Sequence, residues 1–117
     1  MTNLALAHIG DGVYELRVRS YRCTRGDKTV LKLPRDTGEL VKAPTQAKFA
    51  DKLLPHLTED EAAYYRRGKN SHTHAAPKSA SPMEYAKATR LEALFGALYL
   101  LRQTDRLNEL FQILIED

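Results

Sequence analysis

Disulfides, signal peptides and membrane-spanning segments are all missing from this 117-residue sequence, which has one cysteine and no tryptophan. Because Cys23 has no second cysteine to pair with, the fold cannot depend on an internal disulfide, which fits a reducing compartment. No apolar run approaches the roughly 18 residues that a transmembrane helix needs. The first residues also lack the basic and apolar segments of a secretory signal. We therefore expect a cytoplasmic protein with no membrane partner.

The alternating apolar and polar pattern of a half-buried β-strand is also missing, as are hairpin turns between strands. Apolar residues instead recur every three or four positions, which is typical of amphipathic helices. The length is that of one domain. We therefore predict an all-α fold of about five helices in a single domain, residues 1–117. The expected helices cover 4–25, 44–54, 58–67, 82–102 and 104–114.

Short motifs predict where these helices begin and end. Residues 58–61 and 81–84 both follow the pattern Ser/Thr-x-x-Glu, which is the capping box at a helix start. We expect Thr104 to cap the last helix, Pro55 to end the second and Gly68 to stop the third.

Two acidic residues interrupt the most apolar helical segments. Asp11 lies on an apolar face between Gly10 and Gly12, and Glu92 lies in a nearly apolar stretch of the fourth helix. A buried carboxylate must be protonated, paired with a cation or bound to a metal, and each acid alone is most simply a neutralised core residue. Two such acids on separate helices instead favour a divalent-metal site, with magnesium or manganese preferred over zinc. We expect the flanking glycines to leave space for water and substrate.

Four segments of the chain resemble known motifs. LALAHIGDGVYEL (4–16) resembles the ribonuclease III signature, and TRLEALFGALYLL (89–101) resembles the second acidic motif of that family. The closer resemblance is to Mini-ribonuclease III, the bacterial form without a double-stranded-RNA-binding domain. YYRRGKN (64–70), followed by PK at 77–78, is similar to its arginine-rich loop, and LVKAPTQAKFADKLL (40–54) is similar to its central helix.

The departures from the larger ribonuclease III enzymes agree with this subfamily. Those enzymes carry additional acids where this chain has Ala7 and Thr89, and Mini-ribonuclease III is reduced in the same way. Asp11 and Glu92 alone supply few metal ligands, so the number of metal ions in each site stays open. Gly12 replaces a usual alanine, and relatives have a short additional segment before the signature.

The resemblance implies a ribonuclease III-like endonuclease that hydrolyses double-stranded RNA and matures the large-subunit (23S) ribosomal RNA precursor. Asp11 and Glu92 would hold Mg²⁺, with Mn²⁺ as the alternative, and Glu15 and Thr89 would support these two acids. For Glu15, an ion pair with Arg19 one turn later is the simpler expectation. The resemblance also implies a homodimer, assisted by a large-subunit ribosomal protein.

Positive charge is modest overall, with a formal net charge of +3, but it gathers near one predicted loop at 70–80. Double-stranded RNA is recognised mainly by its shape, through phosphates and 2′-hydroxyls, and a basic loop suits that task. The expected RNA-binding residues are Arg66, Arg67, Lys69, Asn70 and Lys78. The alternative is that the two arginines only stabilise the C-terminal end of a helix.

Two other functions remain open from the sequence. A non-catalytic RNA-binding or ribosome-assembly module could keep the same scaffold, although it would have no reason to keep both Asp11 and Glu92. A small helical DNA-binding regulator would need an exposed recognition helix with base-reading side chains, whereas the basic residues here gather in a loop.

Overall fold

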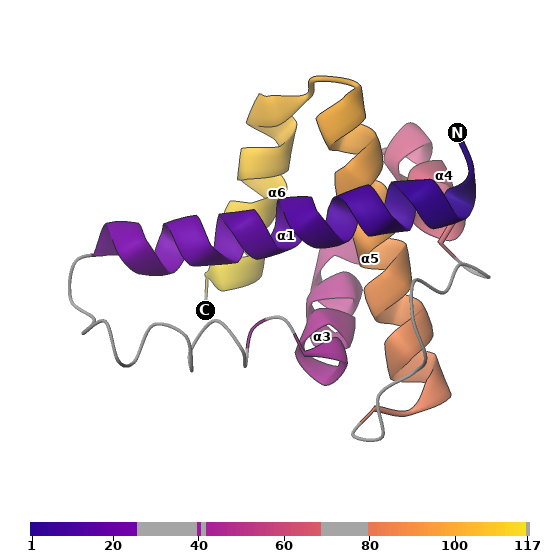
Figure 1. Cartoon of the computed structure of the whole chain (residues 1–117), viewed down its shortest axis with the longest axis horizontal. Coiled ribbons are helices and arrows are strands. Elements are labelled where there is room, and N and C mark those ends of the chain that lie inside the picture. Colours follow the sequence, from indigo (N-terminus) through magenta and orange to yellow (C-terminus); the bar gives the residue numbers. More distant parts are fainter. Residues whose placement is uncertain (26–39, 41, 69–79, 117) are drawn as a thin grey trace.

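The computed structural model describes residues 1–25, 40, 42–68 and 80–116. Within these ranges the chain forms five α-helices and no β-strand, which confirms the all-α prediction (Figure 1). None of the described helices is long and apolar enough to cross a membrane. The helices are α1 (Asn3–Arg25), α3 (Ala43–Leu53), α4 (Glu59–Arg66), α5 (Pro82–Leu100) and α6 (Thr104–Ile115), and the 3-10 turn η1 (Leu54–His56) follows α3.

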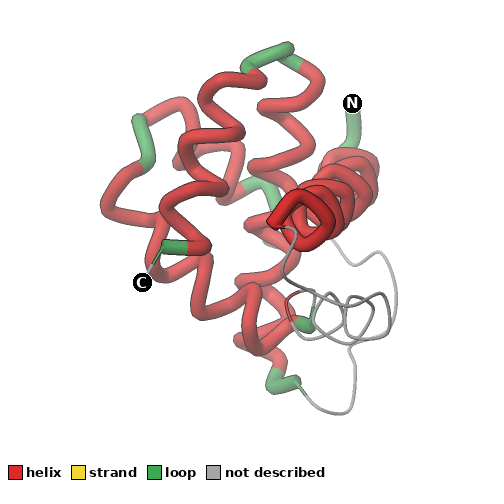
Figure 2. The backbone as a smooth tube through the Cα atoms, turned by 90° about the vertical axis from the view of Figure 1, so that its left-hand side faces the viewer, coloured by secondary structure: helices red, strands yellow, loops and turns green. Residues whose placement is uncertain are grey.

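Helix α5 forms the centre of the fold. All of its residues from 91 to 98 are buried, as expected of a helix that is apolar around its whole circumference. Helices α1, α3, α4 and α6 all pack against it. Figure 2 shows α1 nearly end-on, lying along one side of the other helices. Because α1 and α3 both pack against α5, side chains from three helices can meet at its middle.

Helices α1 and α5 cross in direct backbone contact at two glycines. A Cβ atom on Gly10 would lie 1.6 Å from the carbonyl oxygen of Glu92, and one on Gly96 would lie 2.1 Å from the carbonyl oxygen of Leu6. The expectation that both glycines beside Asp11 leave space is therefore wrong for Gly10, which is buried against α5. Gly12 does face open space, with nothing within 4 Å of a Cβ placed there.

The predicted helix starts are confirmed at α4 and α5. In each capping box the hydroxyl of the N-cap residue accepts a hydrogen bond from the backbone N–H of the glutamate three positions later. The carboxylate of that glutamate in turn accepts one from the backbone N–H of the N-cap residue. The expected cap at Thr104 is wrong by one residue, because Gln103 occupies the N-cap position of α6 without a side-chain cap bond. Pro55 lies in η1, directly after the end of α3, as predicted.

The turn between α5 and α6 explains this shift. The backbone N–H of Gln103 donates to the carbonyl of Leu98, and the N–H of Arg102 donates to that of Tyr99. These two bonds form a Schellman motif, which requires a left-handed residue at its centre. Arg102 supplies that conformation with φ of 60°, although glycine adopts it with less strain. Since the motif ends at Gln103, α6 starts at the next residue.

The core lies where α1, α3, α5 and α6 meet. The four apolar residues predicted for α6 are all buried, and Tyr14 and Val18 of α1 pack with them. The apolar residues of α1 are buried only in part, because Leu16 is 65% exposed and Leu4 is 49% exposed. The buried residues of α6 are Leu107, Leu110, Phe111 and Leu114.

Candidate active site

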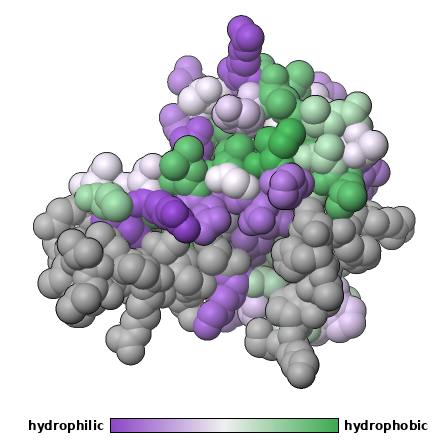
Figure 3. All heavy atoms as spheres, viewed as in Figure 1, coloured by the Kyte–Doolittle hydropathy of each residue, from purple (hydrophilic) through white to green (hydrophobic). Residues whose placement is uncertain are grey.

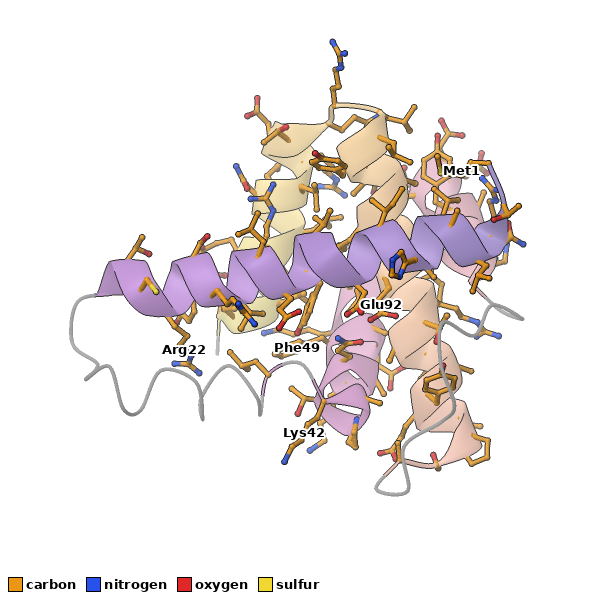
Figure 4. The ribbon with its side chains drawn as sticks, viewed as in Figure 1. Met1, Arg22, Lys42, Phe49 and Glu92 are labelled. Atoms are coloured by element: carbon orange, nitrogen blue, oxygen red, sulfur yellow. The ribbon has the colours of Figure 1, made fainter. Side chains whose placement is uncertain are left out.

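The two acidic residues singled out in the sequence meet at the crossing of α1 and α5. Glu92 is only 7% exposed, and its side chain shares a hydrogen bond with that of Asp11. Figure 4 shows Glu92 at this crossing, facing the gap between α1 and α3. The close approach at Gly10 brings the backbones of the two helices together one residue before Asp11. Two acids 81 positions apart in the sequence, 92 minus 11, therefore form one site.

Glu92 is held as a neutral acid in the metal-free protein. Its burial, and then the charge and the shared hydrogen bond of the neighbouring Asp11, raise the pKa of the carboxyl group to about 9. At neutral pH Glu92 therefore carries a proton that it can donate to Asp11. Pairing with a cation, one of the alternatives for a buried acid, is not found at Glu92, since the two described side chains that bond to it, Asp11 and Gln46, lack positive charge.

A third residue, Gln46, was not anticipated from the sequence. It lies on α3, is 2% exposed and makes a side-chain hydrogen bond to Glu92 that lowers the pKa of the carboxyl group. The signal was present, because Gln46 is the polar member of the buried row that it forms with Ala47, Ala50 and Leu53. A polar residue on an apolar helix face is the same feature that drew attention to Asp11.

Tyr14 lies beneath the acid pair, one turn after Asp11 on α1. Its ring is fully buried against Phe95, with ring centroids 5.7 Å apart, and its hydroxyl donates a 2.8 Å hydrogen bond to the carbonyl of Leu40. Burial, and then the nearby Glu92, raise the pKa of the Tyr14 hydroxyl. Tyr14 therefore stays neutral and joins α1 to the segment that leads into α3.

The two residues predicted to support the acids make local contacts. Glu15 forms the simpler of its expected interactions, a 2.8 Å ion pair with Arg19. Thr89 is 1% exposed, and its hydroxyl donates a 2.9 Å hydrogen bond to the carbonyl of Tyr85 within α5. Thr89 lies almost one turn before Glu92 on the same helix. Support of the acid pair by either residue stays a prediction.

The basic residues expected to bind RNA fall into two groups. Arg66 is exposed at the end of α4, whereas Arg67 holds the chain start in place. The Arg67 guanidinium donates from Nε to Oδ1 of Asn3 at 2.8 Å and from a terminal nitrogen to the carbonyl of Met1 at 2.6 Å. The other three, Lys69, Asn70 and Lys78, lie outside the described residues, as does nearly all of the predicted loop at 70–80.

Gly68 lies directly against the backbone of α5. A Cβ atom on Gly68 would lie 2.6 Å from Cα of Arg90 and 2.7 Å from the carbonyl oxygen of Thr89. Gly68 is therefore required for the close approach of the end of α4 to α5.

The donors at this site fit a hard divalent cation. Asp11 and Glu92 offer carboxylate oxygens, and the amide of Gln46 bonds to Glu92 from outside this pair. Such oxygen donors, completed by water, suit Mg²⁺ or Mn²⁺, whereas zinc prefers nitrogen and sulfur ligands. No cluster of three or more histidine, cysteine, aspartate or glutamate residues exists in the described ranges. The acid pair is the candidate metal centre of the described residues because it brings two carboxyl groups into contact at a buried helix crossing.

Comparison with known proteins identifies the family. Residues 4–103 match the Ribonuclease III domain. The chain is 47% identical to Mini-ribonuclease 3 of Symbiobacterium thermophilum over 109 residues, covering 93% of this chain and 84% of that protein. It is 38% identical to Mini-ribonuclease 3 of Clostridium tetani, covering 98% of this chain and 77% of that protein.

A solved structure gives the same result for the fold. The crystal structure of a Fusobacterium nucleatum protein superposes with a TM-score of 0.86 at 32% identity, covering 98% of this chain and 92% of that one. The prediction made from the four sequence motifs is thereby confirmed. The chain belongs to the ribonuclease III family, in its Mini-ribonuclease III group.

Proposed function

We propose that this ribonuclease is a Mg²⁺-dependent endonuclease that cleaves double-stranded RNA, with Mn²⁺ as an alternative cofactor. The observation that carries the proposal is the contact between Asp11 and Glu92, two costly acids on the two helices that cross at the centre of the fold. A non-catalytic module of the same fold would gain stability by replacing one of them, because a buried carboxyl group costs free energy unless it is used.

The roles of the residues follow from this geometry. Asp11 and Glu92 would hold the cation between α1 and α5, and Glu92 would release its proton to become a ligand. When bound, Mg²⁺ lowers the pKa of a coordinated water and offsets the charge that develops on the scissile phosphate. The protein then needs no side-chain nucleophile, and its own task is to hold two oxygen ligands at a fixed separation.

Phosphate binding is assigned to Arg66 and to the predicted loop that follows it. Arg66 is exposed, and Gly68, two residues later, lies against the α5 backbone at Thr89 and Arg90. We include Lys69, Asn70 and Lys78 in this surface because their charge and polarity suit contacts to RNA phosphates. Arg67 is assigned a structural role in addition, because it binds the chain start.

The substrate and the cellular setting belong to the same proposal. The large-subunit ribosomal RNA precursor, a ribosomal protein as assisting partner and a cytoplasmic location all rest on the resemblance to Mini-ribonuclease III. A transcript of a precursor stem, compared with an unrelated duplex of equal length, tests the substrate. Faster cleavage of the precursor stem is expected, and equal rates would contradict the assignment.

A homodimer is supported by the exposed apolar side chains on α1 and at the end of α5. Figure 3 shows apolar residues gathered on the face where these two helices cross. Large apolar patches on a protein surface usually mark an interface. The side chains concerned are Leu4, Leu16, Tyr99, Leu100 and Leu101, each at least 40% exposed.

Light scattering during gel filtration tests this interface. We expect the mass of a dimer for the unaltered protein and a monomer for the double variant Leu16→Glu, Leu100→Glu. Leu54→Glu is the matched control, because Leu54 is a 43% exposed leucine on η1. A double variant that elutes with the unaltered mass would place the interface elsewhere.

The central test of the proposed function is cleavage of a long RNA duplex in Mg²⁺. Asp11→Asn and Glu92→Gln should each lower the rate by at least about 100-fold, since each removes a charged metal ligand. Asp105→Asn is the control, because it changes an exposed carboxylate at the start of α6. RNA binding without cleavage by the unaltered protein in both Mg²⁺ and Mn²⁺ would favour the non-catalytic module.

A further inference from the structure

Gln46 is the residue of the site for which the family resemblance gave no role. Its side chain is 2% exposed, and α3 brings it to the middle of α5, where it contacts Glu92. Burying an amide without hydrogen bonds costs free energy. An apolar residue would pack at this position in α3 more simply, as Ala47 and Ala50 do. The position of Gln46 therefore suggests a use beyond core packing.

The contact between the amide and the carboxyl group shows what that use is. Gln46 is buried where α3 packs against α5, so its side-chain amide reaches Glu92 from a third helix. Toward a carboxylate oxygen an amide acts as donor through its N–H, which fixes the position of that oxygen. Gln46 therefore holds the Glu92 side chain in place.

The chemistry of the amide suits this position better than other polar groups would. A lysine or arginine would neutralise Glu92 and repel a divalent cation, and a further carboxylate would repel both acids. A neutral amide holds one carboxylate oxygen without cancelling the charge of the group. Hydrogen bonds of this kind, from outside the ligand set, orient metal-binding carboxylates in proteins.

We propose that Gln46 is a positioning residue of this site, whose amide orients the Glu92 carboxylate toward Asp11 and so completes the cation-binding geometry from a third helix. The inference rests on the proposed function, because it concerns the same metal centre. It assigns α3 a direct part in the site, in addition to its packing against α5.

Three variants separate positioning from packing. Gln46→Met keeps the length and approximate volume of the side chain and removes its polar atoms, whereas Gln46→Asn keeps the amide and shortens the chain. Gln112→Met is the matched control, since Gln112 is exposed on α6. The readouts are Mn²⁺ binding without RNA, followed by electron paramagnetic resonance, the thermal midpoint of the metal-free protein, and kcat and KM for an RNA duplex.

Positioning predicts that Gln46→Met weakens Mn²⁺ binding and lowers kcat, each by about 10-fold or more, because loss of an orienting hydrogen bond has effects of this size. KM for RNA and the thermal midpoint should change little, and Gln46→Asn should retain more Mn²⁺ binding than Gln46→Met. A packing role predicts the reverse order, because methionine fills the space and asparagine does not.

The inference would be overturned by unaltered Mn²⁺ binding in Gln46→Met, or by stronger Mn²⁺ binding in Gln46→Met than in Gln46→Asn. Failure of the proposed function can be recognised separately. If the unaltered protein binds Mn²⁺ but cleaves no RNA, the proposed activity is wrong, while the ranking of Mn²⁺ affinities still decides the role of Gln46.

Discussion

Replacing the two glycines that flank Asp11 by alanine provides a paired test of the α1–α5 crossing. Both positions are inside the same helix, so alanine gains about 0.5–1 kcal/mol of helix propensity at each. At Gly12 nothing lies within 4 Å of the added methyl group. Gly12→Ala should therefore stabilise the protein by about that amount, and the melting temperature should rise by roughly 2–6 °C.

At Gly10 the same methyl group would lie 1.6 Å from the Glu92 carbonyl oxygen, whereas ordinary contacts begin at 3.4 Å. Relief of the clash requires the two backbones to separate, because neither atom belongs to a flexible side chain. Overpacking of a core typically costs about 1–3 kcal/mol and more where the surroundings are rigid. We expect Gly10→Ala to be less stable than Gly12→Ala by about 3 kcal/mol, which corresponds to roughly 12 °C in melting temperature.

Urea and thermal unfolding of the metal-free variants, followed by circular dichroism, measure this difference directly. Cleavage of an RNA duplex by the same samples should also fall with Gly10→Ala, since the displaced backbone carries Glu92. Gly96→Ala should behave like Gly10→Ala, because its methyl group would lie 2.1 Å from the Leu6 carbonyl oxygen. A Gly10→Ala variant as stable as Gly12→Ala would refute the close crossing on which the site depends.

Three further predictions follow from other contacts. The pKa of the Glu92 carboxyl group is 4.5 in the unfolded chain and about 9 in the folded protein, so the metal-free protein should lose stability as pH rises from about 5 to 9. Urea unfolding measures this profile, and Glu92→Gln should flatten it. Arg102→Gly should raise stability by about 1 kcal/mol, because Arg102 has a left-handed backbone, with φ of 60°; a lower melting temperature would contradict this. Glu61→Gln should lower the free energy of unfolding by about 2 kcal/mol at neutral pH, since it loses the charged 2.7 Å hydrogen bond from Arg106. Because that bond lowers the pKa of Glu61, the difference in stability should shrink below pH 4, and a difference independent of pH would argue against the ion pair.

The difference between Asp11 and Gln46 shows how much of the site could be predicted. Asp11 and Glu92 were recognisable because a charged group in an apolar helix is unusual in any fold. Gln46 is also polar on an apolar helix face, but it carries no charge, so its signal is weaker than that of the two acids. Only the packing of α3 against α5 brings its amide to Glu92. Contacts between residues 46 and 92 depend on helix geometry that no local pattern contains.

The sequence by itself determined the all-α class, the capping boxes of α4 and α5, the buried row of α6 and the two acids. These features depend on residues three or four positions apart, whose spacing in a helix is constant. The tertiary structure decided that Gly10 is a contact point, that Gln46 joins the acids and that Leu16 stays exposed. Helical periodicity defines a face, but only the packing of whole helices determines which faces meet and how closely.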